Sequence, residues 1–301
     1  MRRTSAALAV GALLLAAGCG SSSGTKAKAS PTPAGPQTYE VQVDANRADL
    51  SLPATEFALA YYPKALTVHP GDTVSFGLNN SGEPHTVALG ALVDAVAVPY
   101  SKLTPAQQQG DPPAALQAAL AKVPELLPQG PGDAIQAGAQ PCFQATGLPP
   151  TKDACPVHTG DFTGTESLVT SGWLDPNAPF TLKIGESAKP GTYNFFCQLH
   201  GPDMGGKLTV AAQDTTVPTP AEVKSAGDTA LKADTDKLAP AAAMLASGTA
   251  KKAFAGVFSQ AFQLGGVAAF GPSAIHVPVG GKVTWQVFGP HVIYFNAPAD
   301  A

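Results

Sequence analysis

A cysteine, a histidine and a methionine lie within eight residues of one another in the second half of the chain. They are Cys197, His200 and Met204 in the segment YNFFCQLHGPDMGG, with the spacing C-x2-H-x3-M. Thiolate, imidazole and thioether groups all bind transition metals. Gly201 and Pro202 directly follow the histidine and predict a turn, which can bring the three side chains round to one point.

A fourth ligand must come from elsewhere, and the segment NNSGEPHTV offers His85 at the start of an expected strand. One thiolate, two imidazoles and a weak thioether form the trigonal His2Cys copper site with a long axial methionine. Soft sulfur ligands suit Cu(I) and imidazole suits Cu(II), so a rigid mixed set serves both states with little rearrangement. The sequence therefore predicts one copper ion, bound by His85, Cys197, His200 and Met204.

The other cysteines leave Cys197 without an obvious disulfide partner. The chain has four cysteines, of which Cys142 and Cys155 bracket a polar loop containing Pro and Gly. In an exported protein this spacing favours a local disulfide between these two. Pairing of Cys197 with either of them stays open on these grounds, although its histidine and methionine neighbours argue against it. A leftover cysteine in an exported protein is a reactive thiol or a ligand.

Several segments around these residues have the pattern of short β-strands. The chain has 301 residues, 44% of them hydrophobic and only 13% charged, with 31 Gly and 29 Pro. So little charge and so many turn residues favour an all-β fold. Apolar residues alternate in segments separated by turn chemistry, which predicts a sandwich or a barrel. The expected strands are in 38–44, 64–80 (two strands joined by a Pro-Gly-Asp turn), 84–89, 179–184, 191–197 and 206–211.

An interruption at about 100–165 separates the two groups of strands. It contains PPAALQAALAKVPELL, in which apolar residues recur near helical spacing, followed by the loop between Cys142 and Cys155. We interpret it as a partly helical insertion carried on the sandwich. It either shapes access to the site, binds a partner or is a decoration without a function of its own.

The first residues have the pattern of a bacterial export signal. Arg2 and Arg3 precede a short apolar run at 6–17, which is too short to be a comfortable transmembrane span. The run ends in LAAGCG, which resembles the lipobox of bacterial lipoproteins, in which the cysteine becomes lipidated. We therefore expect a lipoprotein signal peptide at 1–18 and a lipid on Cys19. The alternative is a plain secretory signal with a coincidental cysteine.

The segment at 19–37 is rich in Ser, Gly and Pro and has the composition of a flexible tether. With the expected lipid, it predicts a protein anchored to the outer face of the bacterial cytoplasmic membrane. The net charge of −4 argues against nucleic acid as a partner.

Residues 57–90 and 166–211 resemble the cupredoxin family, specifically the plastocyanin-like bacterial proteins. The resemblance rests on LTVHPGDTVSF, EPHTV and TSGWL…PFTLKIGESAKPGTYNFFCQLHGPDMGGKLTV. It covers both halves of one domain, 38–212, apart from the insertion. It implies a Greek-key β-sandwich with copper at one end, bound by the four ligands named above. It also implies that the backbone N–H of Thr86 points at the sulfur of Cys197.

Other chemistries for this cysteine fit less well. A Cys–His nucleophile pair predicts a third orienting residue and has no use for Met204. Structural zinc prefers four Cys or His ligands and would not choose a thioether. Multicopper oxidases place histidines on both sides of the cysteine, whereas Phe196 and Gln198 flank it here. A binuclear purple copper site needs two bridging cysteines. The sequence thus favours a carrier over an enzyme.

The C-terminal third contains a second, incomplete copy of the first strands. Residues 213–254 are rich in Ala, Lys and Asp and predict a helical connector. After it, FGPSAIHVPVGGKVTWQVFGPHVIYF repeats YYPKALTVHPGDTVSFGLNNSGEPHTVAL at an offset of 209 residues, for example Gly280 with Gly71. The segment at 255–301 has no Cys or Met. We interpret it as a partial cupredoxin-like repeat without a type 1 copper.

Together these features predict a protein that carries single electrons between redox partners. The edge of His200 beside Gly201 and Pro202 is the expected port for electrons, since a ligand near the surface shortens the path to a partner. The alternative is a copper-binding module for scavenging, delivery or sensing without sustained electron transfer. The sequence does not name the redox partner.

Overall fold

The computed structural model describes residues 35–45, 56–78, 84–108, 113–121, 126, 160–259, 264–288, 293 and 295. All of these residues belong to one compact unit. The predictions on Cys19, Cys142 and Cys155 fall outside the described residues.

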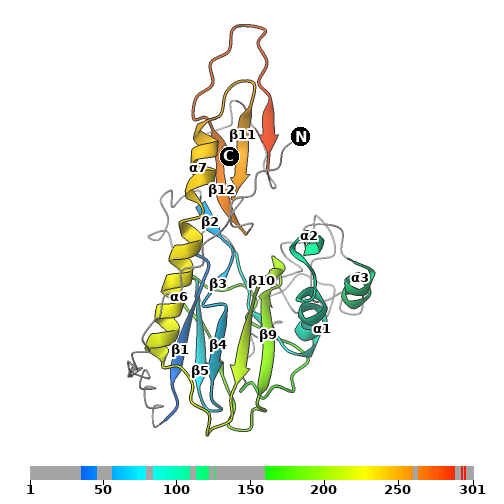
Figure 1. The fold of residues 1–301 in the computed structure, drawn as a ribbon, viewed down its shortest axis with the longest axis vertical. Coiled ribbons are helices and arrows are strands. Elements are labelled where there is room, and N and C mark those ends of the chain that lie inside the picture. The colour runs from blue at the N-terminus through cyan, green and yellow to red at the C-terminus, as the bar shows by residue number, and fades with distance from the viewer. Residues whose placement is uncertain are drawn as a thin grey trace, which may run out of the picture. The chain divides into compact units, whose positions relative to one another are not determined.

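The first sheet brings together strands from both halves of the expected domain, and Figure 1 labels those of the first half. The central strand pair is parallel, and the other two pairings are antiparallel. Along the first strand TYEVQV, buried and more exposed positions alternate, as expected for a sheet with one face on a core. The strand order is β3 (Tyr61–Tyr62), β1 (Thr38–Val43), β5 (Thr73–Leu78) and β8 (Phe180–Lys183).

The second sheet contains the strands on either side of the Cys197 segment. Its two longest strands form an antiparallel hairpin, and a short parallel strand flanks one of them. The strand order is β4 (Ala65–Val68), β10 (Gly201–Val210), β9 (Gly191–Cys197), β6 (Ala88–Leu89) and β7 (Val169–Thr170).

The two sheets share one hydrophobic core, in which aromatic side chains of both sheets meet. Tyr61 and Phe76 of the first sheet meet Phe195 of the second edge to face, with ring centroids 5.0 and 5.5 Å from Phe195. Such pairs contribute about 0.5–1.5 kcal/mol each beyond the area that they bury. Cys197 and Met204 belong to the same buried cluster. The predicted β-sandwich is therefore confirmed, and two of the candidate ligands, Cys197 and Met204, are part of its core.

The segment at 84–89 differs from its prediction as one strand, since only Ala88 and Leu89 pair with neighbours. Residues 84–87 form no ladder because their hydrogen bonds go elsewhere. The N–H of Val87 donates to Ser171 Oγ at 2.8 Å, and the carbonyl of His85 accepts from the N–H of Leu174 at 2.9 Å. The irregular backbone leaves the side chain of His85 free to face the core.

Helices begin directly after β6, about ten residues before the predicted start of the insertion. They are α1 (Ala91–Tyr100), α2 (Pro105–Gln108) and α3 (Ala114–Leu120). Val93 and Val96 of α1, three residues apart, are buried against Phe196 of the second sheet. This contact explains the helix in a segment whose valines do not by themselves favour one. The partly helical insertion is thus confirmed.

Two helices follow the sandwich, α6 (Pro220–Thr235) and α7 (Ala239–Ala246). A capping box starts α6, with Thr219 accepting from the N–H of Glu222 and the carboxylate of Glu222 accepting from the N–H of Thr219. α6 packs against β1 and β3. None of the described helices is long and apolar enough to cross a membrane.

A third sheet contains the predicted repeat, in the order β13 (Trp285–Val287), β11 (Ala253–Phe258), β12 (Gly265–Gly271) and β2 (Glu56–Ala58). β11 has an antiparallel partner in β12 and a parallel partner in β13, just as β1 has β3 and β5. The equivalent glycines Gly71 and Gly280 both have a positive φ, 92° and 79°.

Within the described part of the repeat, the counterpart of β4 is not a strand, and Val277 and Val279 are exposed. In the sandwich, β4 pairs with β10, whereas the described residues of the repeat contain no such partner. β2 extends the sheet at its other edge by pairing with β12. That the repeat is only partial stays a prediction.

Candidate metal centre

Three side chains from distant parts of the chain converge at one end of the sandwich. His85 precedes β6, Cys197 ends β9 and His200 lies in the turn between β9 and β10. Their ligand atoms all lie within 4.8 Å of one another, and His85 Nδ1 is 4.0 Å from Cys197 Sγ. Ligands that bind one transition metal at about 2.0–2.3 Å lie about 3.5–4 Å apart. A small contraction of the group would therefore form a metal site.

His200 has a ring nitrogen that fits a metal ligand. Its Nδ1 is buried and has no hydrogen-bond partner among the described residues. A buried polar atom without a partner costs roughly 1–3 kcal/mol, and metal binding would remove this cost. The ring lies 4.9 Å from that of His85, centroid to centroid, and is tilted by 50°. His200 is only half-buried, in contrast to His85.

Met204 is fully buried in the cluster that contains Cys197. An irregularity in the β9–β10 ladder positions it, because the register shifts between Gly201 and Gly205. Gly205 pairs with Phe196, the residue that precedes Cys197. Met204 therefore lies in the irregular stretch of β10 opposite the end of β9. Its role as the axial ligand stays a prediction.

Cys197 is a free thiol with no exposed surface. The structure therefore excludes the alternative in which it forms a disulfide. Burial raises the pKa of this thiol, but the neighbouring imidazoles of His200 and His85 outweigh the burial and hold the pKa well below its usual range. The thiolate is the form that binds metals.

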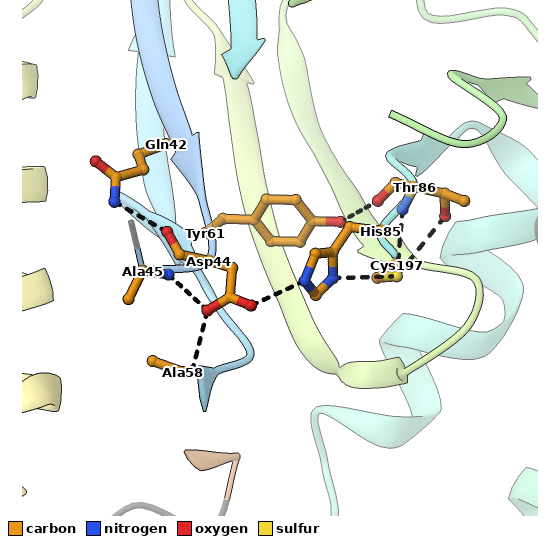
Figure 2. A network of polar contacts seen from close by, with 8 residues as sticks. All are labelled: Gln42, Asp44, Ala45, Ala58, Tyr61, His85, Thr86 and Cys197. Atoms are coloured by element: carbon orange, nitrogen blue, oxygen red, sulfur yellow. Dashed lines mark hydrogen bonds and ion pairs between the residues drawn. The ribbon is translucent and has the colours of Figure 1, made fainter. Parts of the chain in front are cut away.

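The backbone N–H of Thr86 donates to Cys197 Sγ at 3.4 Å, as the family resemblance implies. The Thr86 hydroxyl lies 3.8 Å from the same sulfur and accepts from the N–H of Gln198 at 2.8 Å. On the other side, the buried Tyr61 hydroxyl donates to the Thr86 carbonyl at 2.5 Å. Thr86 is thus held by hydrogen bonds at its N–H, its hydroxyl and its carbonyl. Figure 2 shows the bonds to Cys197 and Tyr61.

Asp44 lies next to His85, a contact that sequence reasoning missed. Its Oδ2 is 3.0 Å from His85 Nε2, and both side chains are fully buried (Figure 2). Burial lowers the pKa of His85, but the hydrogen bonds with Asp44 and Cys197 outweigh this and raise it to about 9. The alternation in TYEVQVD predicts only that Asp44 is the last residue of a strand, and no sequence signal connects it to a histidine 41 residues away.

The residues that flank Cys197 have no role as metal ligands. Phe196 and Gln198 are both fully buried. The side-chain oxygen of Gln198 accepts from Thr170 Oγ1 at 2.7 Å, and its Nε2 donates to the Leu126 carbonyl at 3.3 Å. The flanks therefore hold the end of β9 in the core.

Two other histidines, His69 and His276, belong to the described residues. His69 Nε2 contacts the carbonyl of Thr215 at 2.8 Å, which explains why this histidine is buried. His276 is exposed, and His158 falls outside the described residues. Within the described part of the chain, the group of His85, Cys197 and His200 is the one cluster with metal-ligand geometry.

No protein-family model matches the sequence, and no curated protein does. Among solved structures, reduced auracyanin from Roseiflexus castenholzii matches with 19% identity and a TM-score of 0.29, covering 59% of this chain and 98% of that one. Oxidized plastocyanin from Dryopteris crassirhizoma matches with 16% identity and a TM-score of 0.24, covering 57% and 98%. A multicopper oxidase, mgLAC, matches with 13% identity and a TM-score of 0.23, covering 60% and 40%.

At such low identities and TM-scores, the interpretation of the site rests on the geometry of this chain. A buried free thiol, a buried imidazole and an orphaned ring nitrogen converge at one end of a two-sheet β-sandwich. The sandwich is the fold that the sequence resemblance to cupredoxins implies, and the group of His85, Cys197 and His200 is compatible with a type 1 copper site.

Proposed function

We propose that this protein binds one copper ion in a type 1 site and carries single electrons between redox partners. The convergence of the buried free Cys197 with His85 and with the unpartnered Nδ1 of His200 is the observation that carries the proposal. Met204 completes the proposed ligand set. When bound, copper supplies a one-electron Cu(II)/Cu(I) couple.

The chain keeps the ligands in one arrangement. Cys197 and Met204 are packed in the core, and Asp44 holds the ring of His85. The N–H of Thr86 faces the sulfur of Cys197. Ligands that cannot move keep the structural change between oxidation states small, which favours fast electron exchange. Their burial also excludes water from the site.

His200 is the proposed port for electrons. It is half-buried, whereas His85, Cys197 and Met204 have no exposed surface. Among the proposed ligands, it therefore offers the shortest path between copper and a partner protein. Gly201 and Pro202, both half-buried, lie beside it.

The fixed, buried ligand set favours a carrier over the other functions. A protein that delivers copper must release it, which a set held inside the core hinders. Catalysis of the multicopper type needs a path to further copper ions, and Phe196 and Gln198 offer no ligand for one beside Cys197. We therefore propose a carrier and not an enzyme.

The proposed place of action is the outer face of the bacterial cytoplasmic membrane, with a lipid on Cys19 as the anchor. The basic start, the short apolar run and the LAAGCG motif support this location. The proposed partner is a redox protein in the same compartment.

A visible spectrum tests the function. Cu(II) is added to the purified full-length protein, and a type 1 site predicts an intense thiolate-to-copper charge-transfer band, which Cys197→Ser abolishes. A colourless or only faintly blue product from the unmodified protein would contradict the proposal. Cyclic voltammetry then separates the carrier from a delivery or storage protein, since only the carrier needs a reversible one-electron couple.

A further inference from the structure

A buried carboxylate lies directly behind one of the proposed copper ligands. We propose that Asp44 is the charged partner of His85, holding its ring and lowering the reduction potential of the copper site, an inference that rests on the proposed type 1 function. The two side chains meet at 3.0 Å, between Asp44 Oδ2 and His85 Nε2.

The tautomer of His85 follows from the positions of its two ring nitrogens. Nδ1 faces Cys197 Sγ at 4.0 Å, and Nε2 faces Asp44 (Figure 2). A neutral imidazole that binds a metal through Nδ1 carries its proton on Nε2. This proton therefore has Asp44 as its acceptor. Such a bond fixes the orientation of a metal-binding imidazole and raises its basicity.

Asp44 is built to accept hydrogen bonds on both oxygens. Its Oδ1 accepts from the N–H of Ala45 at 2.5 Å and from the N–H of Ala58 at 3.0 Å. With His85 this makes three donors on one carboxyl group, the pattern of an ionised carboxylate, which accepts only. The described structure gives Asp44 an ion pair with His85 alone.

The backbone around Asp44 is as closely held as its side chain. Its N–H donates to the carbonyl of Ala60 at 2.8 Å, and its carbonyl accepts from Gln42 Nε2 at 2.9 Å. Its φ of 61° lies in the left-handed region, which non-glycine residues seldom adopt. Ala58, one of the amides that bind the carboxylate, pairs through β2 with Gly265 of the repeat. A network of hydrogen bonds to the backbone thus holds the carboxylate of Asp44 in position next to His85.

The charge of Asp44 favours the oxidised site. In a buried site, the charges of Cu(II), the Cys197 thiolate and the Asp44 carboxylate cancel. One electron from the redox partner would then leave one net negative charge in the protein interior. Such a charge is costly in a medium of low dielectric constant. A neutral acceptor in place of Asp44 would leave the reduced site uncharged.

The test is the reduction potential of the copper-loaded full-length protein with Asp44→Asn. Removing a hydrogen-bond partner of a metal-binding histidine changes metal affinity by about 10- to 100-fold. If the variant loses this factor in its affinity for Cu(II) and keeps its affinity for Cu(I), the ratio of the two affinities falls by the same factor. For a one-electron couple, the potential then rises by about 60–120 mV.

Asp72→Asn is the matched control. Asp72 is also buried, and its two oxygens accept from the backbone N–H groups of Gln37 and His69, both at 2.7 Å. It precedes β5 at Thr73, whereas Asp44 follows β1 at the other end of the same strand pair. The substitution removes a similar carboxylate that contacts no proposed copper ligand. The reduction potential of Asp72→Asn should therefore equal that of the unmodified protein.

Equal potentials in Asp44→Asn and Asp72→Asn, with the charge-transfer band intact in both, would overturn the role of Asp44 and leave the type 1 function standing. Absence of the band from the unmodified protein would instead overturn the proposed function, and the inference with it. The two failures are therefore distinguishable.

If Asp44→Asn does not fold, a measurement on the unmodified protein tests whether His85 Nε2 donates to Asp44. In the Cu(I) form, which is diamagnetic, NMR reports the proton on each imidazole nitrogen. We expect a proton on His85 Nε2 that is shifted downfield and protected from exchange with solvent, unlike that of the half-buried His200. A His85 Nε2 proton that exchanges as fast as that of His200 would contradict the proposal.

Discussion

Cys197 pairs with Gly201 across the β9–β10 ladder, while Phe196, only one residue earlier, pairs with Gly205. Between these two pairs, β9 advances by one residue and β10 by four. The three additional residues of β10 end at Met204, which is fully buried. A local irregularity of the sheet thus inserts the proposed axial ligand into the core beside the end of β9.

Met204→Leu should keep the fold and the copper but raise the reduction potential. Leucine has a similar volume and cannot bind copper, so the loss of a donor ligand favours Cu(I). The expected cost in the free energy of unfolding is below about 1.5 kcal/mol, against about 2–5 kcal/mol for Met204→Ala. Voltammetry and urea denaturation measure the two effects. An unchanged potential in Met204→Leu would rule out the axial role.

Gly206→Ala should destabilise the hairpin next to the site. An added Cβ would lie 2.3 Å from a ring carbon of Phe195 and 2.5 Å from the carbonyl oxygen of Lys64. Overpacking of this kind costs about 1–3 kcal/mol. Gly77→Ala in β5 is the control, since its Cβ would meet no atom within 4 Å. Equal unfolding midpoints in urea for the two variants would show that β10 moves freely away from these atoms.

Thr86→Val should lower both the stability and the reduction potential. The change keeps the shape but removes the hydroxyl, so the buried N–H of Gln198 loses its acceptor at a cost of about 1–3 kcal/mol. The sulfur of Cys197 also loses a nearby hydrogen-bond donor, which strengthens its donation to Cu(II). Thr86→Ser retains the hydroxyl and should restore both values towards those of the unmodified protein. A lower potential in Thr86→Ser as well would exclude the hydroxyl as the cause.

Asp94→Ala should loosen the first helix of the insertion. Asp94 Oδ1 accepts from the backbone N–H of Asn194 at 3.0 Å and from its Nδ2 at 2.6 Å, which ties α1 to β9. We expect faster hydrogen exchange in α1 and a loss of about 1–2 kcal/mol in unfolding free energy. Asp228→Ala breaks only an exposed pair with Lys224 and should change little. Unaltered exchange in α1 would mean that its apolar contacts alone hold it.

Glu166 should stabilise the protein only above acidic pH. Burial raises the pKa of its carboxyl, but hydrogen bonds from the Thr163 hydroxyl and from backbone N–H groups outweigh this and hold the pKa below 4.5. Because the folded pKa is lowered, the stabilisation is complete above about 4.5 and is lost as the pH falls through the folded pKa. Glu166→Gln should therefore be less stable near neutral pH, with a difference that shrinks in acid. Urea denaturation across pH measures it, with the exposed Glu186→Gln as control.

Much of the fold was predictable because it depends on local patterns. Alternating apolar residues and a Pro-Gly-Asp turn predicted the strands that became β1, β4, β5, β8 and β9. The helix α1 was not predicted, because its valines pack on Phe196, a contact between residues about a hundred positions apart. Local propensity carries no information on such a contact.

For the site, the sequence by itself determined the types of ligand. Cys197, His200 and Met204 are close together in one short segment, and family motifs pointed to His85. Only the tertiary structure decided how these groups are held. It brought Asp44 to within 3.0 Å of His85, buried Cys197 as a free thiol and left His200 half-exposed. These relationships depend on the packing of two sheets, and spacing along the chain does not record which side chains meet across a core.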